Sequence, residues 1–380
     1  MIGAVALLDE GIARLLESFR SEPFADGNFV CLMRWSDCHC FLFALAAALC
    51  FAVAGCSRHQ PVDNPQPGVY YWRTTLRLDN TERDFLAQHH IGKMYVRYFD
   101  VVMRDGRPMP NATLQFLQPV PTGVEIIPTV FVMEECMRSQ MVDEMARLLV
   151  ERVLQMNETN DVPDVQELQI DCDWTEQSQT AYFAFLNKVG ELLHERKMQL
   201  SATIRLHQLR MAPPPVDYGV LMVYNTGSVR RMDQRSPILD KQDVATYLGD
   251  LEDYDLKLCA AYPNFDWQVL YSSDGRYKAI LYDEDLNDSS VYRQVAPDRW
   301  VAISSRDIPT LNEDASQATW VVVGDSVRLF RPSAELVLNT ARALEKERPG
   351  INDQVIVYSL NSKNIKQYKS SYYESLYHHR

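Results

Sequence analysis

Two carboxylates near the middle of the chain have the types and spacing that acid–base chemistry requires. Asp171 and Asp173 lie in the segment 165–176, VQELQIDCDWTE, where Leu168 and Ile170 alternate with polar residues. Successive side chains of a strand point to opposite faces, so the two aspartates share one face and the apolar residues share the other. Two close carboxylates raise the pKa of one member, which suits it to donate a proton. The segment therefore predicts a catalytic pair, with Asp173 as the better acid or base.

A structural explanation of the same residues stays open. An acid on an otherwise buried strand is costly unless it faces a polar site or a basic partner. Arg97 and Arg205 lie on two other predicted strands, and either of them could neutralise one aspartate inside the fold. Thr175 stands where a helix should begin, directly before Glu176, and threonine at such a position is typical of a helix N-cap.

Polar residues also occur along the next predicted strand. By parity, Thr203, Arg205 and His207 face away from the apolar side of that strand. Arg205 and His207 are therefore candidates for contact with a ligand or for pairing with a carboxylate. No second histidine or cysteine has a spacing that suits His207 as a metal ligand, so neither a metal nor a cofactor is expected.

Eight β-like runs, with helical patterns between them, would position these residues. The runs cover the segment 165–176 and the ranges 69–76, 93–103, 125–132, 200–209, 218–224, 256–262 and 354–360. Strands that alternate with helices are typical of α/β folds, and eight of them predict a (β/α)8 TIM-type barrel whose site lies at the C-terminal strand ends. Residues 267–331 break this rhythm and predict a β-rich insertion after the seventh strand. Pro128 argues against a fully paired central position for the third strand.

Composition and charge exclude several classes of partner and site. The chain is 46% hydrophobic and 23% charged, which is ordinary for a globular protein. Its net charge of -13 argues against a nucleic-acid partner, whose phosphates attract basic surfaces. Beyond residue 56 the cysteines are Cys136, Cys172 and Cys259, an odd number without close pairs. They do not indicate a disulfide framework or a metal cluster.

A short apolar run near the N-terminus has the length of a signal-peptide core. Residues 41–55, FLFALAAALCFAVAG, are too few for a comfortable transmembrane helix, and Cys56 follows them. The sequence Val-Ala-Gly-Cys at 53–56 resembles a bacterial lipobox, whose cysteine is lipidated and becomes the first mature residue. The resemblance implies a lipoprotein signal peptide over residues 33–55 and a membrane anchor through lipid on Cys56.

This signal divides the rest of the chain. Met33 is the expected start, and residues 1–32 are interpreted as a non-native upstream extension, because they fit no targeting pattern. Residues 56–67 are rich in proline and polar residues and predict a tether, so the barrel and its insertion fall within 68–380. The expected location is the bacterial cell envelope. The absence of aspartate directly after Cys56 favours the outer membrane.

Several strand ends together resemble the chitinase and endo-N-acetylglucosaminidase type of glycoside hydrolase. The fourth strand of that family ends in Asp-x-x-Asp-x-Asp-x-Glu, and Asp171 and Asp173 keep the central part of this signature. The sixth strand ends in Met-x-Tyr-Asp, which residues 222–225 match except for Asn225. Residues 261–265, AYPNF, resemble the end of the seventh strand. The chain also resembles an uncharacterised group of bacterial lipoprotein barrels with the same Asp-x-Asp strand end.

The resemblance implies a glycan ligand and extends the candidate site. Catalytic roles fall on Asp171, Asp173 and Tyr224, and on Glu176 as a displaced acid, because Thr175 occupies the family's acid position and cannot donate a proton near neutral pH. The aromatic residues Trp174, Tyr262 and Trp267 could stack on sugar rings or could belong to the core. The candidates for substrate contact are Arg97, Trp174, Arg205, His207, Asn225, Tyr262 and Trp267.

Three functions remain open from the sequence. The missing glutamate favours a lipid-anchored envelope protein that binds a glycan without efficient hydrolysis. The first alternative is an active glycoside hydrolase that uses Asp173 or Glu176 as its acid on N-acetylhexosamine-containing glycans. The second alternative is a structural envelope lipoprotein. The expected partners are a glycan and, through Cys56, a membrane.

Overall fold

The computed structural model describes residues 62–139, 141–281, 283–309 and 318–378. The predicted upstream extension, the signal peptide, Cys56 and most of the tether lie outside these ranges. All described residues belong to one compact unit that spans residues 59–380. Within the described ranges, none of the helices combines the length and apolar character that a membrane crossing requires.

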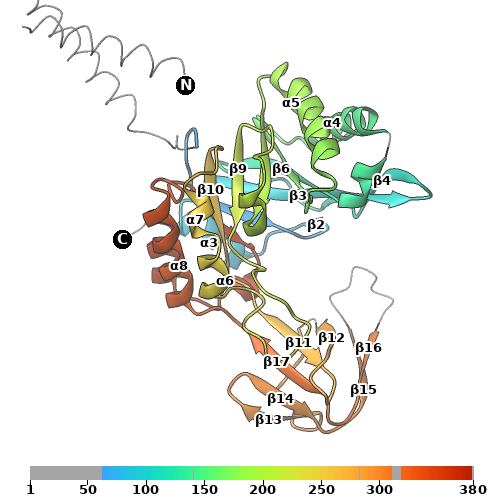
Figure 1. Ribbon diagram of the computed structural model, residues 1–380, viewed down its shortest axis with the longest axis vertical. Coiled ribbons are helices and arrows are strands. Elements are labelled where there is room, and N and C mark those ends of the chain that lie inside the picture. Colours follow the sequence, from blue (N-terminus) through green and yellow to red (C-terminus); the bar gives the residue numbers. More distant parts are fainter. Residues whose placement is uncertain (1–61, 140, 282, 310–317, 379–380) are drawn as a thin grey trace, which may run out of the picture. The chain divides into compact units, whose positions relative to one another are not determined.

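A closed barrel of eight parallel strands forms the centre of this unit (Figure 1). Each strand pairs with its sequence neighbour, and the barrel closes where β1 pairs with both β3 and β18. The TIM-type barrel that the sequence predicts is therefore confirmed. In barrel order the strands are β1 (Gly68–Tyr71), β3 (Lys93–Arg104), β6 (Glu125–Val132), β7 (Glu167–Asp171), β8 (Gln199–Arg205), β9 (Tyr218–Met222), β10 (Leu258–Pro263) and β18 (Val355–Tyr358).

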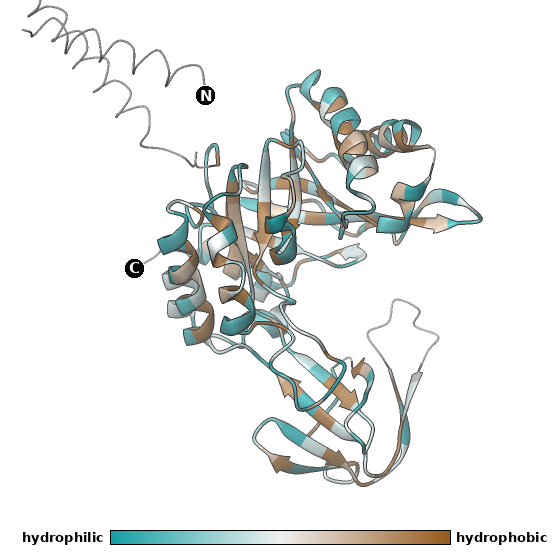
Figure 2. Ribbon diagram, viewed as in Figure 1, coloured by the Kyte–Doolittle hydropathy of each residue, from teal (hydrophilic) through white to brown (hydrophobic). Residues whose placement is uncertain are grey.

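Helices follow the barrel strands and cover them with their apolar faces. In Figure 2 hydrophobic residues run along the strands, while the helices carry both hydrophobic and hydrophilic residues. The first of these helices begins with a capping box between Asp79 and Glu82. The helices are α3 (Asn80–Gln88), α4 (Val142–Thr159), α5 (Gln179–His194), α6 (Lys241–Ala245), α7 (Leu248–Leu251), α8 (Ala334–Glu347), α9 (Ser362–Ile365) and α10 (Ser370–His378), with 3-10 turns η1 (Glu134–Arg138) and η2 (Leu206–Arg210).

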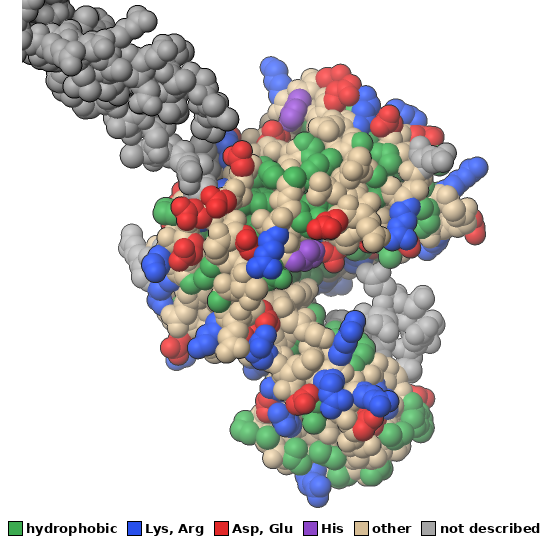
Figure 3. All heavy atoms as spheres, in the orientation of Figure 1, with side chains coloured by type: hydrophobic (Ala, Val, Ile, Leu, Met, Phe, Trp, Pro, Cys, Tyr) green, Lys and Arg blue, Asp and Glu red, His purple; other side chains and the backbone are tan. Residues whose placement is uncertain are grey.

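The segment between β10 and β18 contains the expected β-rich insertion. Five antiparallel strands lie in the order β12-β11-β17-β14-β13 around a separate small core that includes Leu270 and Trp300. Hydrophobic side chains also reach the surface of this insertion (Figure 3), where Val295, Trp320 and Val323 are more than half exposed. Its strands are β11 (Trp267–Tyr271), β12 (Tyr277–Leu281), β13 (Tyr292–Ala296), β14 (Arg299–Ala302) and β17 (Ser326–Phe330), with the pair β15 (Arg306–Pro309) and β16 (Ala318–Val321).

One short strand extends the barrel sheet, and two others form a separate two-stranded sheet. β4 (Arg107–Asn111) returns antiparallel to the end of β3, and β2 (Thr75–Leu76) pairs in parallel with β5 (Gln115–Phe116). The third barrel strand, β6, is central but not fully paired, as Pro128 predicts. Pro128 pairs with Val96 on one side, and the ladder to β7 begins one residue later, at Thr129. The missing N–H of the proline therefore falls where that second ladder has not yet begun.

Buried polar residues lie inside the barrel near the N-terminal ends of its strands. Glu167 accepts hydrogen bonds from Ser201 Oγ at 2.5 Å and from Tyr218 Oη at 2.6 Å. Its second oxygen lies 3.7 Å from Lys93 Nζ, which is an ion-pair distance but too long for a hydrogen bond. Burial raises the pKa of Glu167, and the charge of Lys93 and the two hydroxyl donors oppose that rise.

The buried pair of Glu167 with Lys93 predicts that the free energy of unfolding depends on pH. A raised pKa in the folded state means that Glu167 stabilises the fold below its unfolded pKa of about 4.3 and that this contribution is lost as the pH rises through the folded pKa. Lys93→Met should raise that folded pKa further, so the variant should lose more stability relative to the wild type at pH 8 than at pH 5. Urea unfolding at both pH values measures this difference. Lys188→Met, which removes the exposed pair with Glu191, is the control and should leave stability unchanged at either pH. Equal losses at pH 5 and pH 8 in Lys93→Met would contradict the assignment.

Candidate functional site

The first aspartate of the predicted pair is a buried ion-pair partner. Asp171 is the last residue of β7, is only 3% exposed, and accepts a hydrogen bond from Thr203 Oγ1 at 2.6 Å. The same oxygen, Oδ1, accepts one from Arg205 Nη2 at 3.0 Å. Burial disfavours the charge on Arg205, but Asp171 and Asp173 outweigh burial and raise the pKa of the guanidinium. In the structure, Asp171 therefore makes the pairing with Arg205 inside the barrel that the structural explanation of this carboxylate expects.

The second aspartate lies past the strand end and faces solvent. The side chain of Asp173 is 63% exposed, and its Oδ1 lies 3.9 Å from both Arg205 Nε and His207 Nε2. His207 is not on a strand as expected. The fifth barrel strand ends at Arg205, and the chain turns there into η2, which leaves the imidazole half exposed at the rim. Asp171 and Asp173 therefore both lie at the end of β7, but Asp171 is buried and Asp173 is exposed to solvent.

The segment after Asp173 differs from the expected helix start. Thr175 is not the N-cap of α5, because that helix begins at Gln179 and has Ser178 at the N-cap position. Thr175 Oγ1 instead donates to Glu134 Oε1 at 2.5 Å, and Ser178 Oγ donates to the same oxygen at 2.9 Å. These hydrogen bonds, the one from Thr175 first, hold the pKa of Glu134 below its usual range. Glu134, which the sequence does not single out, is therefore an ionised carboxylate near neutral pH.

Glu176, the displaced acid that the sequence suggests, lies at the same rim. Its side chain is exposed and borders a shallow pocket of about 520 Å³ together with Glu134, Arg138 and His207. Asp171 and Tyr224 do not line this pocket. Glu176 therefore borders a different pocket from the one that Asn225 and Trp267 line.

Tyr224 enters the barrel mouth two residues beyond β9. Its ring stacks on Tyr358 with centroids 4.9 Å apart and meets Phe265 edge-on at 6.0 Å. Burial, followed by the nearby hydroxyl of Tyr70, raises the pKa of Tyr224, so its hydroxyl keeps its proton. That hydroxyl is shielded from solvent and has no hydrogen-bond partner in the described parts of the chain. A buried donor without a partner is costly and suits a site in which a ligand supplies the acceptor.

A pocket of about 440 Å³ opens between the barrel mouth and the first strands of the insertion. Two candidates from the sequence, Asn225 and Trp267, line it together with Trp72, Phe265 and Tyr358. Asn225 adopts a left-handed backbone with a φ of 55°, which asparagine tolerates better than most residues. The combination of aromatic faces with an amide is suited to an uncharged polar ring. Among the described residues, no group of three His, Cys, Asp or Glu side chains is placed to hold a metal ion.

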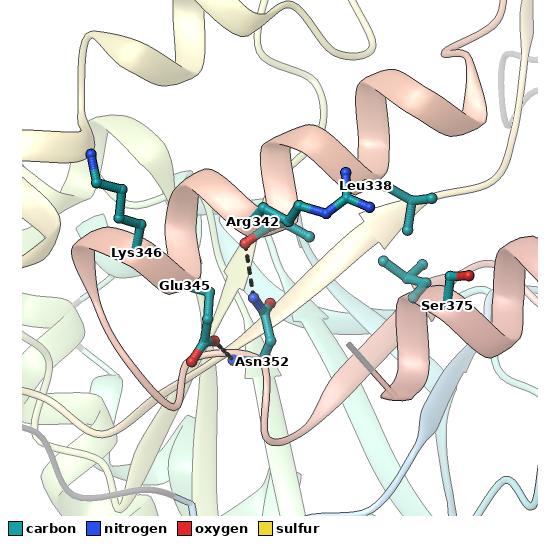
Figure 4. A pocket seen from close by; sticks show the side chains of 8 residues that line it. Leu338, Arg342, Glu345, Lys346, Asn352 and Ser375 are labelled. Carbon is teal, nitrogen blue, oxygen red and sulfur yellow. Dashed lines mark hydrogen bonds between the residues drawn. The ribbon is translucent and has the colours of Figure 1, made fainter. Parts of the chain in front are cut away.

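Two of the aromatic candidates are not available to a ligand in this structure. Trp174 is fully buried and stacks on Tyr182 with centroids 5.8 Å apart, because the chain beyond the strand end turns this side chain into the core. Tyr262 is also fully buried, and its hydroxyl donates to Asn352 Oδ1 at 2.6 Å. Figure 4 shows Asn352 beneath α8, where it donates to a backbone carbonyl of that helix. Tyr262 therefore points to the helical layer and not to the mouth.

Arg97 lies inside the barrel near Trp72 and is paired within its own strand. Its Nε donates to Asp100 Oδ1 at 2.7 Å, and its guanidinium lies 5.7 Å from the centroid of the Trp72 ring. The sequence left open whether Arg97 or Arg205 neutralises an aspartate of the pair, and in the structure Arg205 pairs with Asp171. Burial raises the pKa of Tyr358, and the charge of Arg97 opposes that rise.

Sequence reasoning missed three residues of this region. Trp72 and Tyr358 line the pocket from the ends of the first and last barrel strands, and Glu134 follows the third strand. A signal for the two aromatics was present, because both lie inside predicted barrel strands, 69–76 and 354–360, whose C-terminal ends were expected to form the site. Glu134 had no such signal, since its contacts with Thr175 and Ser178 join residues more than forty positions apart.

Comparisons with known proteins identify the fold and not the family. No family model and no curated protein matches the sequence. Among solved structures, a chitinase from Chromobacterium violaceum has a TM-score of 0.50 at 10% sequence identity, over 82% of this chain and 98% of that one. The Bacillus megaterium spore cortex-lytic enzyme SleL has a TM-score of 0.48 at 10% identity, over 81% of this chain and 74% of its own. The chain thus resembles chitinase-type barrels in fold.

Proposed function

We propose that this chain is a lipid-anchored protein of the bacterial cell envelope whose barrel mouth binds an N-acetylhexosamine-containing glycan without hydrolysing it efficiently. The observation that carries the proposal is the composition of the mouth. Trp72, Trp267 and Tyr358 line the pocket and offer faces for sugar rings, and Asn225 offers hydrogen bonds. Behind this lining, Tyr224 stacks on Tyr358, and its hydroxyl has no partner among the described residues. The chitinase that shares the fold makes an N-acetylglucosamine polymer the first glycan to test.

The lack of hydrolysis follows from the carboxylates around the mouth. A glycosidic oxygen leaves as a hydroxyl only when a positioned acid protonates it. Asp171 is held by Arg205, and Thr175 stands at the position where the related family has its acid. Glu134 is ionised and already accepts two hydroxyl donors. Glu176 and Asp173 face solvent at the rim.

The lipid anchor on Cys56 remains a proposal based on the sequence, and it has a consequence for orientation. The described chain begins at Val62, and Asp63 pairs with Lys257 directly before β10, at the N-terminal ends of the strands. An extended chain spans at most about 3.5 Å per residue, so residues 57–61 reach about 20 Å. A lipid on Cys56 would therefore tether the chain at the end of the barrel opposite the mouth.

Calorimetric titration tests the glycan site. The chain from Ser57 to Arg380, which contains the whole compact unit, is titrated with N-acetylglucosamine oligomers and with peptidoglycan fragments. Trp267→Ala should weaken binding about 10-fold or more, because a lost aromatic contact of about 1.4 kcal/mol corresponds to a factor of ten. Trp320→Ala is the matched control, since Trp320 lies in the same insertion but does not line the mouth pocket. Lack of binding by the wild type would leave the structural envelope protein as the better account.

The hydroxyl of Tyr224 gives a second prediction. Tyr224→Phe should weaken glycan binding up to about 10-fold, because one hydrogen bond contributes about 0.5–1.5 kcal/mol. Its unfolding free energy should not fall, because the hydroxyl has no partner to lose. Tyr182→Phe is the control: this hydroxyl is also buried and unpartnered, but it lies in the core beside Trp174. Equal binding by Tyr224→Phe and the wild type would exclude a ligand contact for this hydroxyl.

A further inference from the structure

A second groove lies outside the barrel mouth, between the start of α8 and the segment that leads into α10. Its volume is about 670 Å³. Gln367, Tyr368 and Tyr372 line it from one side, and α8 contributes Leu338 from the other. Leu338 and Ser375, which Figure 4 labels, also border the neighbouring pocket farther along the same two helices.

Polar atoms without partners distinguish this groove from an ordinary gap between helices. Both amide atoms of Gln367 and the hydroxyl of Tyr372 are shielded from solvent, and none of them has a hydrogen-bond partner among the described residues. The Tyr372 side chain is only 5% exposed. Most buried polar groups in folded proteins are hydrogen-bonded, so three unpaired atoms on one wall need an explanation. Rotating the Gln367 amide into the groove breaks no hydrogen bond, because it makes none.

The aromatic wall of the groove is held in place. Tyr368 and Tyr372 stack with centroids 4.5 Å apart, and the Tyr368 hydroxyl donates to the carbonyl of Pro332 at 2.6 Å. A fixed ring beside an amide that can donate and accept is the chemistry that recognises a sugar, which has an apolar ring face and adjacent hydroxyl groups. A purely apolar ligand would leave the amide unpaired and is therefore disfavoured.

The groove is also close to the mouth pocket. Asp266 lines the mouth pocket, Arg331 lines the groove, and the two side chains form an ion pair, with Arg331 Nε 3.1 Å from Asp266 Oδ2. One ion pair thus joins the linings of the two cavities. We infer that the groove lined by Gln367, Tyr368 and Tyr372 is a second sugar-binding site, separate from the barrel mouth.

Calorimetry with the disaccharide of N-acetylglucosamine counts the sites on the soluble chain from Ser57 to Arg380. The wild type should bind two molecules, Trp267→Ala in the mouth should retain one site, and the double variant with Gln367→Met should retain none. Gln118→Met is the matched control, because its amide nitrogen is also buried and unpartnered but lies outside the groove.

The outcomes separate this inference from the proposed function of the mouth. One site that Gln367→Met abolishes and Trp267→Ala leaves intact would support the groove and refute binding in the mouth. A number of sites that Gln367→Met leaves unchanged would overturn the inference. Folding is checked with Gln367→Met and Tyr372→Phe, whose Tm should stay equal or rise by about 2 °C, since each removes a buried polar group without a partner.

Discussion

Replacing Arg205 with methionine is expected to lower the free energy of unfolding by about 3–5 kcal/mol. The variant keeps the packing volume but leaves Asp171 buried, 3% exposed, without its charged partner. Thr203 Oγ1 still donates to the carboxylate, but a neutral hydroxyl does not compensate for the lost guanidinium. Denaturant titration followed by circular dichroism measures the loss.

Two further variants make this result interpretable. The double variant Asp171→Asn with Arg205→Met removes both charges and should recover most of the stability, because the asparagine oxygen can still accept from Thr203. Arg210→Met is the surface control, since the pair of Arg210 with Asp250 is half exposed and should contribute less than about 1 kcal/mol. If Arg205→Met were no less stable than Arg210→Met, the pair with Asp171 would not support the fold.

Incubation with N-acetylglucosamine oligomers is expected to release no product above background. A positioned general acid contributes about 10²–10⁴ to the rate, so the chain should be at least about 100-fold slower than the chitinase of Chromobacterium violaceum measured beside it. The physical reason is that the buried Asp171 pairs with Arg205, while Asp173 is exposed and lies past the strand end.

The same assay with rim variants tests this explanation. Glu176→Gln and Asp173→Asn should leave the background unchanged, because both carboxylates are exposed at the rim. Cleavage that disappears in either variant would instead identify a hydrolase that uses that carboxylate as its acid.

The barrel was predictable because alternation along a chain is a local signal. Eight β-like runs with helical patterns between them require only short-range periodicity, and the strand faces of Asp171 and Arg205 follow from parity. Parity fails where strands end. Trp174 lies just past β7, and His207 lies inside η2. The strand alternation that predicts side-chain directions therefore does not apply to them.

Contacts between distant segments were beyond the sequence. The sequence contains several carboxylates that could pair with Arg97. Only the packed structure shows that Arg97 pairs with Asp100. The meeting of Glu134 with Thr175 depends on how the loops after β6 and β7 lie against each other. The outward direction of Tyr262 depends on Asn352, which is 90 residues away. Such choices depend on tertiary packing and have no local pattern.

The most direct test of the central claim recovers the ligand from its complex. The soluble chain is mixed with the pentamer of N-acetylglucosamine, the complex is separated from free sugar by gel filtration, and the bound sugar is released and weighed by mass spectrometry. Intact pentamer bound by the wild type, and bound more weakly by Trp267→Ala, is the predicted result. Shorter oligomers in the complex would show that the barrel is a hydrolase, and a complex without sugar would show that the mouth binds no such glycan.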